Sequence, residues 1–235
     1  MQNDVVAQVY PWQKTVWDTL TGRFPKLGHG LLFYGKKGCG KEAFAQYFLA
    51  WVLCANRHER NAPCGECSSC LWLKSDTHPN YVYISTDEEN KKQNAKIKIE
   101  KIRDLLPFVQ QTVDGWRVIV IEPAEALNIA SANALLKTLE EPGDRIVIIL
   151  LADHYLKLPA TIRSRLQHFA LDRMSEAQAD AYLTEYLPDL DQTQKQLLLN
   201  LSNQMPLQAM QLASAEWPNK RQEFLNDWQK LVTQK

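Results

Sequence analysis

Four of the five cysteines in the 235-residue chain stand within one short window of the sequence. They are Cys54, Cys64, Cys67 and Cys70, in the spacing C-x9-C-x2-C-x2-C. A C-x2-C pair brings two thiolates to one tetrahedral metal ion, with zinc–sulfur distances of about 2.3 Å. Four thiolates complete such a site and leave no open position, so the window predicts a closed, structural zinc site. An iron–sulfur cluster also takes four thiolates and is the alternative.

Disulfides explain these cysteines less well, because they are rare in a reducing cytosol and a redox pair does not need four thiols. His58 and His78 stand nearby, and either could replace a thiolate as a ligand. The fifth cysteine, Cys39, belongs to a different motif, and we expect it to pack rather than to react. The basic side chains near the window favour a solvated face over a nucleic-acid contact. They are Arg57, His58, Arg60 and Lys74.

A second chemical motif is the loop GKKGCGKE at residues 35–42, which follows an apolar run and opens a helical pattern. It matches G-x4-G-K, in which backbone N–H groups surround a phosphate and the lysine reaches the β- and γ-phosphate oxygens. The dipole of the following helix adds to the attraction. The residues that this motif predicts for binding a phosphate are Gly35, Gly38, Gly40, Lys41 and Glu42.

Glu42 departs from the motif, because a Ser or Thr at this position supplies the hydroxyl that binds Mg²⁺. A carboxylate about 4 Å from a triphosphate costs on the order of 1–4 kcal/mol for each close charge pair. We therefore expect a loop that keeps its shape without holding a nucleotide, and ATP is left open as a ligand. The alternative is a working ATPase that uses Lys41 and Glu42 in an unusual way.

Hydrolysis of ATP also requires a pair of acidic side chains at the end of a buried strand, one for Mg²⁺ and one for the attacking water. The apolar run at 118–121 ends in Glu122, which could serve the metal, but the next residue is Pro123 and has no ionisable group. Glu125 stands three residues beyond Glu122 and cannot take the second position without a backbone shift. The chain alone is therefore not expected to hydrolyse ATP.

The elements that must hold these residues alternate between apolar β-branched runs and helical patterns. The expected strands span residues 30–34, 81–84, 117–121 and 145–151. The expected helices between them span residues 42–53, 97–111 and 131–140. Continuous apolar runs indicate strands buried on both faces, and strand–helix alternation predicts a parallel sheet with helices on both sides, an α/β fold.

Strand signals stop at about Leu171, and helical patterns follow. Ser175 and Asp191 are expected to cap helices that end near Tyr186 and Asn203, and Pro206 opens a third helix. Three domains are therefore expected. They are residues 1–170 with the cysteine module at about 54–72, a small helical domain at 171–213, and the start of a truncated further domain at 214–235.

The bulk composition narrows the setting in which the chain works. The chain is 45% hydrophobic, enough for one full core and a small second unit, and no run approaches the ~18 apolar residues of a membrane span. Residues 1–9 lack a basic-then-apolar secretory pattern, so we expect a cytoplasmic protein with no membrane partner. The 27 basic side chains balance 27 acidic ones, which disfavours nucleic-acid binding through a global positive field.

Two longer motifs resemble those of a known family. NALLKTLEEP at 133–142 and LPATIRSR at 158–165 are similar to the AAA+ subunits of the bacterial DNA polymerase III clamp loader, the family of the gamma/tau and delta-prime proteins. The resemblance extends from about Tyr10 to about Leu212. It implies an AAA+ RecA-like P-loop domain with an inserted zinc module, a small helical lid domain, and a C-terminal helical collar domain that is largely absent from this chain.

Departures from the motor pattern of this family resemble its non-hydrolysing, delta-prime branch. In the motor subunits the phosphate loop ends in Thr, the acidic strand end is Asp-Glu, a polar Thr follows the next central strand, and an Arg opens the last lid helix. The corresponding residues here are Glu42, Glu122-Pro123, Ala152-Asp153 and Leu207. The alternatives are an ATP-hydrolysing, gamma/tau-like motor subunit and a zinc-containing nucleic-acid-binding protein on an ATPase fold.

Ser164-Arg165 resembles the Ser-Arg-Cys motif of the family, with Leu166 in place of the Cys. The resemblance implies that Arg165 acts in trans as an arginine finger at the ATP site of an adjacent motor subunit, where such a residue is worth ~10³–10⁵ in rate. Arg163 should point elsewhere, because adjacent residues on a helix differ in direction by about 100°. The alternative is that Arg165 is an ordinary surface cation.

The family resemblance also implies the partners. They would be the gamma/tau motor subunits and the delta subunit of the loader, with the sliding clamp and primed DNA as indirect partners. The chain would then be one component of the DNA polymerase III holoenzyme, a nucleotidyltransferase complex. Structural zinc agrees with the resemblance, because these subunits carry a zinc module inserted at this place.

Overall fold

The structure of the chain is a computed structural model. It describes residues 8–86, 95–111, 113–215 and 228. The described residues form two compact units, one within residues 1–36 and 40–173 and the other within residues 37–39 and 174–235. Within the described residues, no helix has the length and apolar character that crossing a membrane requires.

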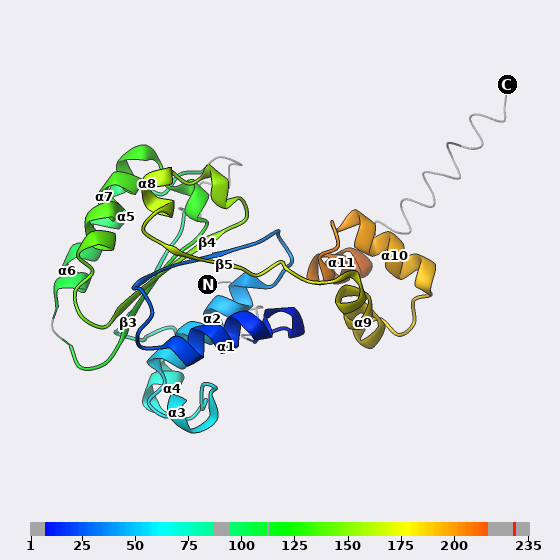
Figure 1. Cartoon of the computed structure of the whole chain (residues 1–235), viewed down its shortest axis with the longest axis horizontal. Helices are drawn as coiled ribbons and strands as arrows, with labels where there is room; N and C mark the ends of the chain where they lie inside the picture. Colours follow the sequence, from blue (N-terminus) through cyan, green and yellow to red (C-terminus); the bar gives the residue numbers. More distant parts are fainter. Residues whose placement is uncertain (1–7, 87–94, 112, 216–227, 229–235) are drawn as a thin grey trace. The chain divides into compact units, whose positions relative to one another are not determined.

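A five-stranded parallel sheet organises the first unit (Figure 1). Its strands are β1 (Gly30–Tyr34), β2 (Tyr81–Ile84), β3 (Arg117–Ile121), β4 (Ile146–Ala152) and β5 (Gln167–Ala170). They lie in the order β2-β3-β4-β1-β5. Every residue of β3 and β4 is buried, which is why both strands read as continuous apolar runs. The predicted parallel α/β sheet is confirmed.

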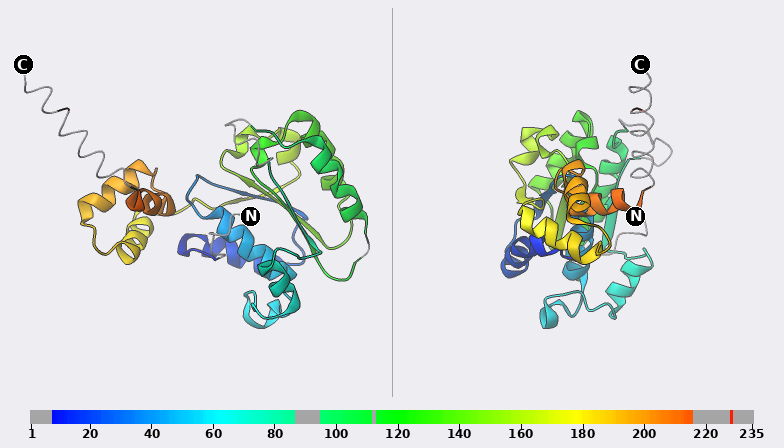
Figure 2. Two further views of the ribbon diagram at one scale, coloured as in Figure 1. Left: turned by 180° about the vertical axis from the view of Figure 1, so that it is seen from behind. Right: turned by 90° about the vertical axis from the view of Figure 1, so that its right-hand side faces the viewer.

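Helices cover both faces of this sheet, as Figure 1 and the view from behind in Figure 2 show. On one side lie α1 (Lys14–Arg23) and α2 (Lys41–Leu53), and on the other lie α5 (Ile99–Arg103), α6 (Leu105–Gln110), α7 (Ile129–Glu140) and α8 (Ala160–Arg163). Two short helices, α3 (Arg57–Arg60) and α4 (Ser68–Lys74), follow α2 and form a separate module. Short 3-10 turns complete the unit: η1 (Pro11–Gln13), η3 (Ala124–Ala126) and η4 (Tyr155–Lys157).

Aromatic packing fixes α1 and α2 against the sheet. The Trp17 ring makes edge contacts with Phe44 at 6.2 Å and Phe48 at 6.3 Å, and both of these rings contact Phe33 of β1. Phe33, Phe44 and Phe48 are fully buried. Aromatic pairs of this geometry contribute about 0.5–1.5 kcal/mol each beyond the area they bury. The helix that carries the phosphate loop is therefore held firmly on β1.

The opposite face of the sheet is filled by aliphatic side chains. Ile102, Leu105 and Leu135 pack from the helices onto β3 and β4, and each is 2% exposed or less. Asn128 begins α7, because its side chain accepts the N–H of Ser131 at 2.8 Å and closes a capping box. This core fixes α7, whose C-terminal end carries one of the longer sequence motifs.

Three sequence expectations for this unit need correction. The helix expected at 97–111 is two helices, because Pro107 has no N–H for the carbonyl of Arg103 and its ring crowds that carbonyl. Ile97 pairs instead with Leu127 in an isolated β-bridge. Strand β4 begins at Ile146 rather than one residue earlier. Strand β5 was not expected, because its four residues, QHFA, show no apolar run.

The part of the second unit that the structure describes contains the helices α9 (Glu176–Tyr186), α10 (Gln192–Leu201) and α11 (Pro206–Ser214). The predicted caps are confirmed, since Ser175 and Asp191 both accept a backbone N–H and form capping boxes. The second helix ends before the expected Asn203, because Asn203 and Gln204 adopt positive φ values of 54° and 66°. The domain start expected at 214–235 falls almost wholly outside the described residues.

Candidate functional site

The structure brings the four clustered cysteines together. Their Sγ atoms all lie within 4.8 Å of one another, with 4.0 Å between Cys64 and Cys70 and 4.0 Å between Cys67 and Cys54. Four sulfurs at about 2.3 Å from a tetrahedral ion are about 3.8 Å apart, so the spacing fits one metal ion. Cys54 comes from the C-terminal end of α2 and Cys70 from α4, while Cys64 and Cys67 lie on the loop between α3 and α4. These residues could hold a metal ion.

Backbone amides in this loop point at the sulfurs. The N–H of Cys64 donates to the Sγ of Cys54 at 3.4 Å, and the N–H of Cys67 donates to the Sγ of Cys64 at 3.3 Å. The N–H groups of Glu66 and Cys67 lower the pKa of the Cys64 thiol to about 6. Gly65, with φ of 77°, allows the loop to turn this way. The loop is thus arranged to stabilise thiolates, the form that binds metal.

Burial acts in the opposite direction at the other end of the cluster, where it raises the pKa of Cys70 to about 12. Burial therefore disfavours the thiolate at this end of the cluster, and a bound metal ion would favour it. The two candidate histidines are not needed as ligands. His78 accepts the N–H of Asn80 at its Nδ1, and its Nε2 contacts the hydroxyl of Ser69 at 2.6 Å. His58 is exposed and is not part of the cluster.

A metal-content measurement tests this cluster. The purified chain should carry one metal ion, because the four sulfurs form one closed site, and removing the ion with a chelator should lower the melting temperature. Cys67→Ser should lose the ion, whereas Cys39→Ser should keep it, because buried Cys39 lies outside the cluster. Elemental analysis and thermal unfolding followed by circular dichroism report both results. An unchanged metal content in Cys67→Ser and Cys70→Ser would contradict the assignment.

The phosphate-loop residues connect β1 to α2. Gly40 is the N-cap of α2 with φ of 85°, a left-handed conformation that favours glycine, and Lys41 begins the helix. Lys41 is only 2% exposed. The predicted loop therefore exists with the expected strand–loop–helix context, and its lysine is turned inward.

The ammonium of Lys41 is already paired with carboxylates of the same chain. Its Nζ lies 2.9 Å from an oxygen of Glu42 and 2.5 Å from an oxygen of Asp153. Asp153 directly follows β4, and its neighbour Ala152 stands opposite Tyr34 at the end of β1, so the parallel register brings the two strand ends together. A buried ammonium needs such partners, because an unpaired buried charge costs several kcal/mol. The sequence marked Asp153 only as a lost polar residue, and its pairing with Lys41 was missed.

Glu122 adds a third acid at the same edge of the sheet. It accepts a hydrogen bond from the Tyr83 hydroxyl at 2.9 Å. Burial, together with the nearby charge of Glu42, raises the pKa of Glu122 to about 7. The carboxylate of Glu125 accepts a hydrogen bond from the backbone N–H of His154. It therefore does not replace the carboxylate that is missing at Pro123. Among the described residues, the position directly after Glu122 is Pro123, which has no carboxylate to activate water.

The raised pKa of Glu122 predicts a pH-dependent stability. Between about pH 4.5 and pH 7 the native carboxyl keeps its proton while the unfolded one loses it, so stability falls as the pH rises through this window. Glu122→Gln should remove that fall, a difference on the order of 1–3 kcal/mol. Urea unfolding at four pH values from 4.5 to about 7.5 measures it. The exposed Glu100→Gln serves as the control, and parallel pH curves for wild type and Glu122→Gln would refute the expectation.

Arg165 lies in the turn between α8 and β5, not on a helix as expected, because α8 ends at Arg163. Its Nε and Nη2 contact one oxygen of Glu140 at 2.8 Å and 2.5 Å, and its Nη1 donates to the carbonyl of Thr161 at 2.9 Å. The side chain is 37% exposed. Arg163 does point elsewhere and donates to the carbonyl of Leu158.

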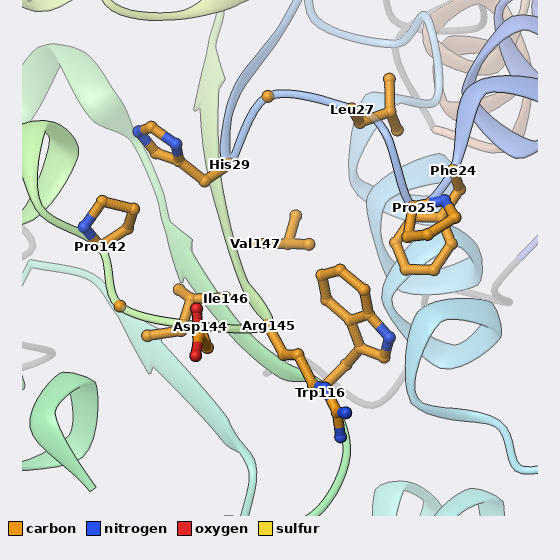
Figure 3. Close-up of a pocket in the computed structure, with 12 residues that line it drawn as sticks. Phe24, Pro25, Leu27, His29, Trp116, Pro142, Asp144, Arg145, Ile146 and Val147 are labelled. Carbon is orange, nitrogen blue, oxygen red and sulfur yellow. The ribbon is translucent and has the colours of Figure 1, made fainter. Parts of the chain in front are cut away.

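A cleft of about 210 Å³ lies at the opposite edge of the sheet, where β1 and β4 begin (Figure 3). The Phe24 and Trp116 rings, 4.5 Å apart, line it together with Arg145. Arg57 lies 5.3 Å over the Phe24 ring, and its Nη1 donates to the carbonyls of Val52 and Cys54 at the end of α2. These contacts join the cysteine module to the sheet, so Arg57 acts here as a packing and capping residue.

The fold and the site define a class of protein, the AAA+ type of P-loop fold. A solved structure of a RuvB mutant from Thermotoga maritima is 16% identical and matches with a TM-score of 0.50, over 85% of this chain and 58% of that chain. At this identity the likeness shows the fold alone. Within the class, the family described as "DNA polymerase III, delta subunit" matches residues 13–175.

Curated relatives narrow the assignment. DNA polymerase III subunit delta' from Pseudomonas aeruginosa is 37% identical over 97% of this chain and 69% of its own length. The subunit delta' from Haemophilus influenzae is 30% identical over 95% of this chain and 67% of its own length. A subunit tau from Bacillus subtilis is 33% identical over 73% of this chain and 29% of its own length. The chain belongs to the DNA polymerase III delta-prime family of clamp-loader subunits.

Proposed function

We propose that this clamp-loader subunit does not hydrolyse ATP itself but completes the ATP site of a neighbouring motor subunit. The observation that carries the proposal is the occupied lysine: Lys41 is paired within the chain by Glu42 and Asp153. In this role the chain works in the cytoplasm with gamma/tau and delta subunits to load the sliding clamp onto primed DNA. Residues 171–213 act as the helical lid.

Two carboxylates contact the Lys41 ammonium, the group that would otherwise bind the phosphate oxygens of a nucleotide. A triphosphate would have to displace them from Lys41 and would then remain within a few ångströms of their charge. Each such contact is worth on the order of 1–4 kcal/mol at about 4 Å. Pro123 leaves the acidic strand end without a second carboxylate, so a nucleotide that did bind would lack the group that activates water. Binding and hydrolysis are therefore disfavoured by separate features.

Arg165 has the properties that an arginine finger needs. It is partly exposed, it lies on a turn, and its guanidinium can form two parallel hydrogen bonds with phosphate oxygens. Its positive charge would neutralise the charge that builds on the γ-phosphate of the neighbour's ATP. The cysteine site takes zinc in a structural role, because four thiolates at tetrahedral spacing leave no open position for chemistry.

Reconstituted loader tests the arginine. Arg165→Ala in the full-length subunit should leave assembly intact and lower ATP turnover by the motor subunits, by ~10³-fold or more at the adjacent site. The matched control is Lys157→Ala, which removes another exposed cation next to α8. Steady-state ATPase and clamp-loading rates, with assembly checked by size-exclusion chromatography, are the measurements. Wild-type ATPase and clamp-loading rates with Arg165→Ala would refute the proposed function and would identify Arg165 as an ordinary surface cation.

Removing the two carboxylates that pair with Lys41 tests whether they prevent the phosphate loop from binding ATP. The double variant Glu42→Thr, Asp153→Asn supplies a hydroxyl for Mg²⁺ and removes both carboxylates, so ATP should bind tenfold to thousandfold more tightly, on the order of 1–4 kcal/mol. ATP turnover should stay absent because Pro123 is unchanged. Isothermal titration with Mg-ATP and a phosphate-release assay measure the two effects. Tight binding with turnover by the wild-type chain would instead favour the gamma/tau-like motor alternative.

A further inference from the structure

Arg165 is held by two groups that come from different helices. Glu140 is the last residue of α7, and Thr161 lies in α8. The carboxylate oxygen of Glu140 contacts Nε and Nη2 of the guanidinium, and the Thr161 carbonyl accepts from Nη1. A guanidinium has five N–H donors. These three contacts use three of them, which leaves two N–H bonds, one on each terminal nitrogen.

The end of α7 is rigid enough to serve as a fixed point. Leu139, next to Glu140, is 2% exposed and belongs to the main core, and its carbonyl lies 2.5 Å from Nε2 of His29. Arg165, by contrast, lies on the turn that connects α8 to β5. A fixed carboxylate on a packed helix can therefore set the direction of an arginine on a less constrained segment.

The position of Glu140 is not explained by the stability of its own helix. The C-terminal end of a helix carries partial negative charge, so a carboxylate in the last turn is unfavourable by about 0.3–1 kcal/mol, whereas a cation there is favourable. With the guanidinium of Arg165 against this carboxylate, the unfavourable interaction is offset. The pair is half-exposed, at 37% for Arg165 and 50% for Glu140, so its electrostatic contribution to folding is small. Direction, not stability, is what the pair provides.

We propose that Glu140 is a positioning residue for Arg165. Its carboxylate binds Nε and Nη2 of the guanidinium, so that the two remaining N–H groups face the γ-phosphate at the neighbouring ATP site. This inference rests on the proposed function of Arg165. Glu140 does not touch the nucleotide, and its effect passes wholly through the arginine. A misplacement of about 1 Å at a reacting centre can cost 10²-fold in rate, so the direction of this side chain matters.

Variants of the full-length subunit in reconstituted loader test the inference. Glu140→Ala should lower kcat for ATP hydrolysis by about 10-fold to 10²-fold and leave KM for ATP almost unchanged, because positioning acts in the transition state. Glu140→Gln keeps an acceptor oxygen at the same reach and should recover most of the rate. The matched control is Glu141→Ala. Glu141 is the adjacent exposed glutamate, and it lines a different cleft with Val109 and Asp144.

A double-mutant cycle separates positioning from a general structural effect. In the Arg165→Ala background, Glu140→Ala should cause no further loss, because the group it directs is gone. Thermal unfolding of each variant confirms that it folds. If Arg165→Ala slows hydrolysis while Glu140→Ala is as fast as wild type, or if the two losses add, the positioning role is overturned and the arginine finger stands. If Arg165→Ala has no effect, the proposed function itself fails.

Discussion

The positive charge of Lys41 is almost wholly buried, and a buried charge must have a negative partner close by. In a working phosphate loop that partner would be the nucleotide. Here Glu42 and Asp153 supply it from within the chain, one from the next position of α2 and one from the end of β4. This pairing connects the loop, its helix and the neighbouring strand at the carboxyl edge of the sheet. The same contact accounts for the proposed loss of nucleotide binding, because it occupies the ammonium that would otherwise bind phosphate oxygens.

The remaining functional features lie away from that edge and do not depend on it. The cysteine module follows α2, and Arg57 and the Phe24–Trp116 pair join it to the opposite edge of the sheet. Arg165 lies on a turn after α8, directed by the end of α7. Under the proposed function, a subunit built this way has no ATP chemistry of its own but keeps a stable core and an arginine for the ATP site of a neighbour. The rigid sheet supports each feature separately.

Local signals account for the parts of the fold that the sequence predicted well. Fully buried strands appear in the sequence as apolar runs. Ser175 and Asp191 mark the starts of α9 and α10, because an N-cap contact involves residues only a few positions apart. Pro107 is a usable local signal for the break between α5 and α6, because proline disrupts a helix interior. Strand β5 had none, because it is short and partly exposed and is defined by its hydrogen bonds to β1, far away in the sequence.

The sequence by itself determined the cluster of four cysteines, the phosphate-loop motif, the missing acid at Pro123 and the family of the chain. Each of these depends on residue type and short spacing. Only the tertiary structure decided which charges meet: Asp153 with Lys41, and Glu140 with Arg165. Those partners stand far apart along the chain, and strand order, register and helix packing bring them together. A pattern of residues states which side chains carry charge, but an ion pair depends on distances that only the folded chain defines.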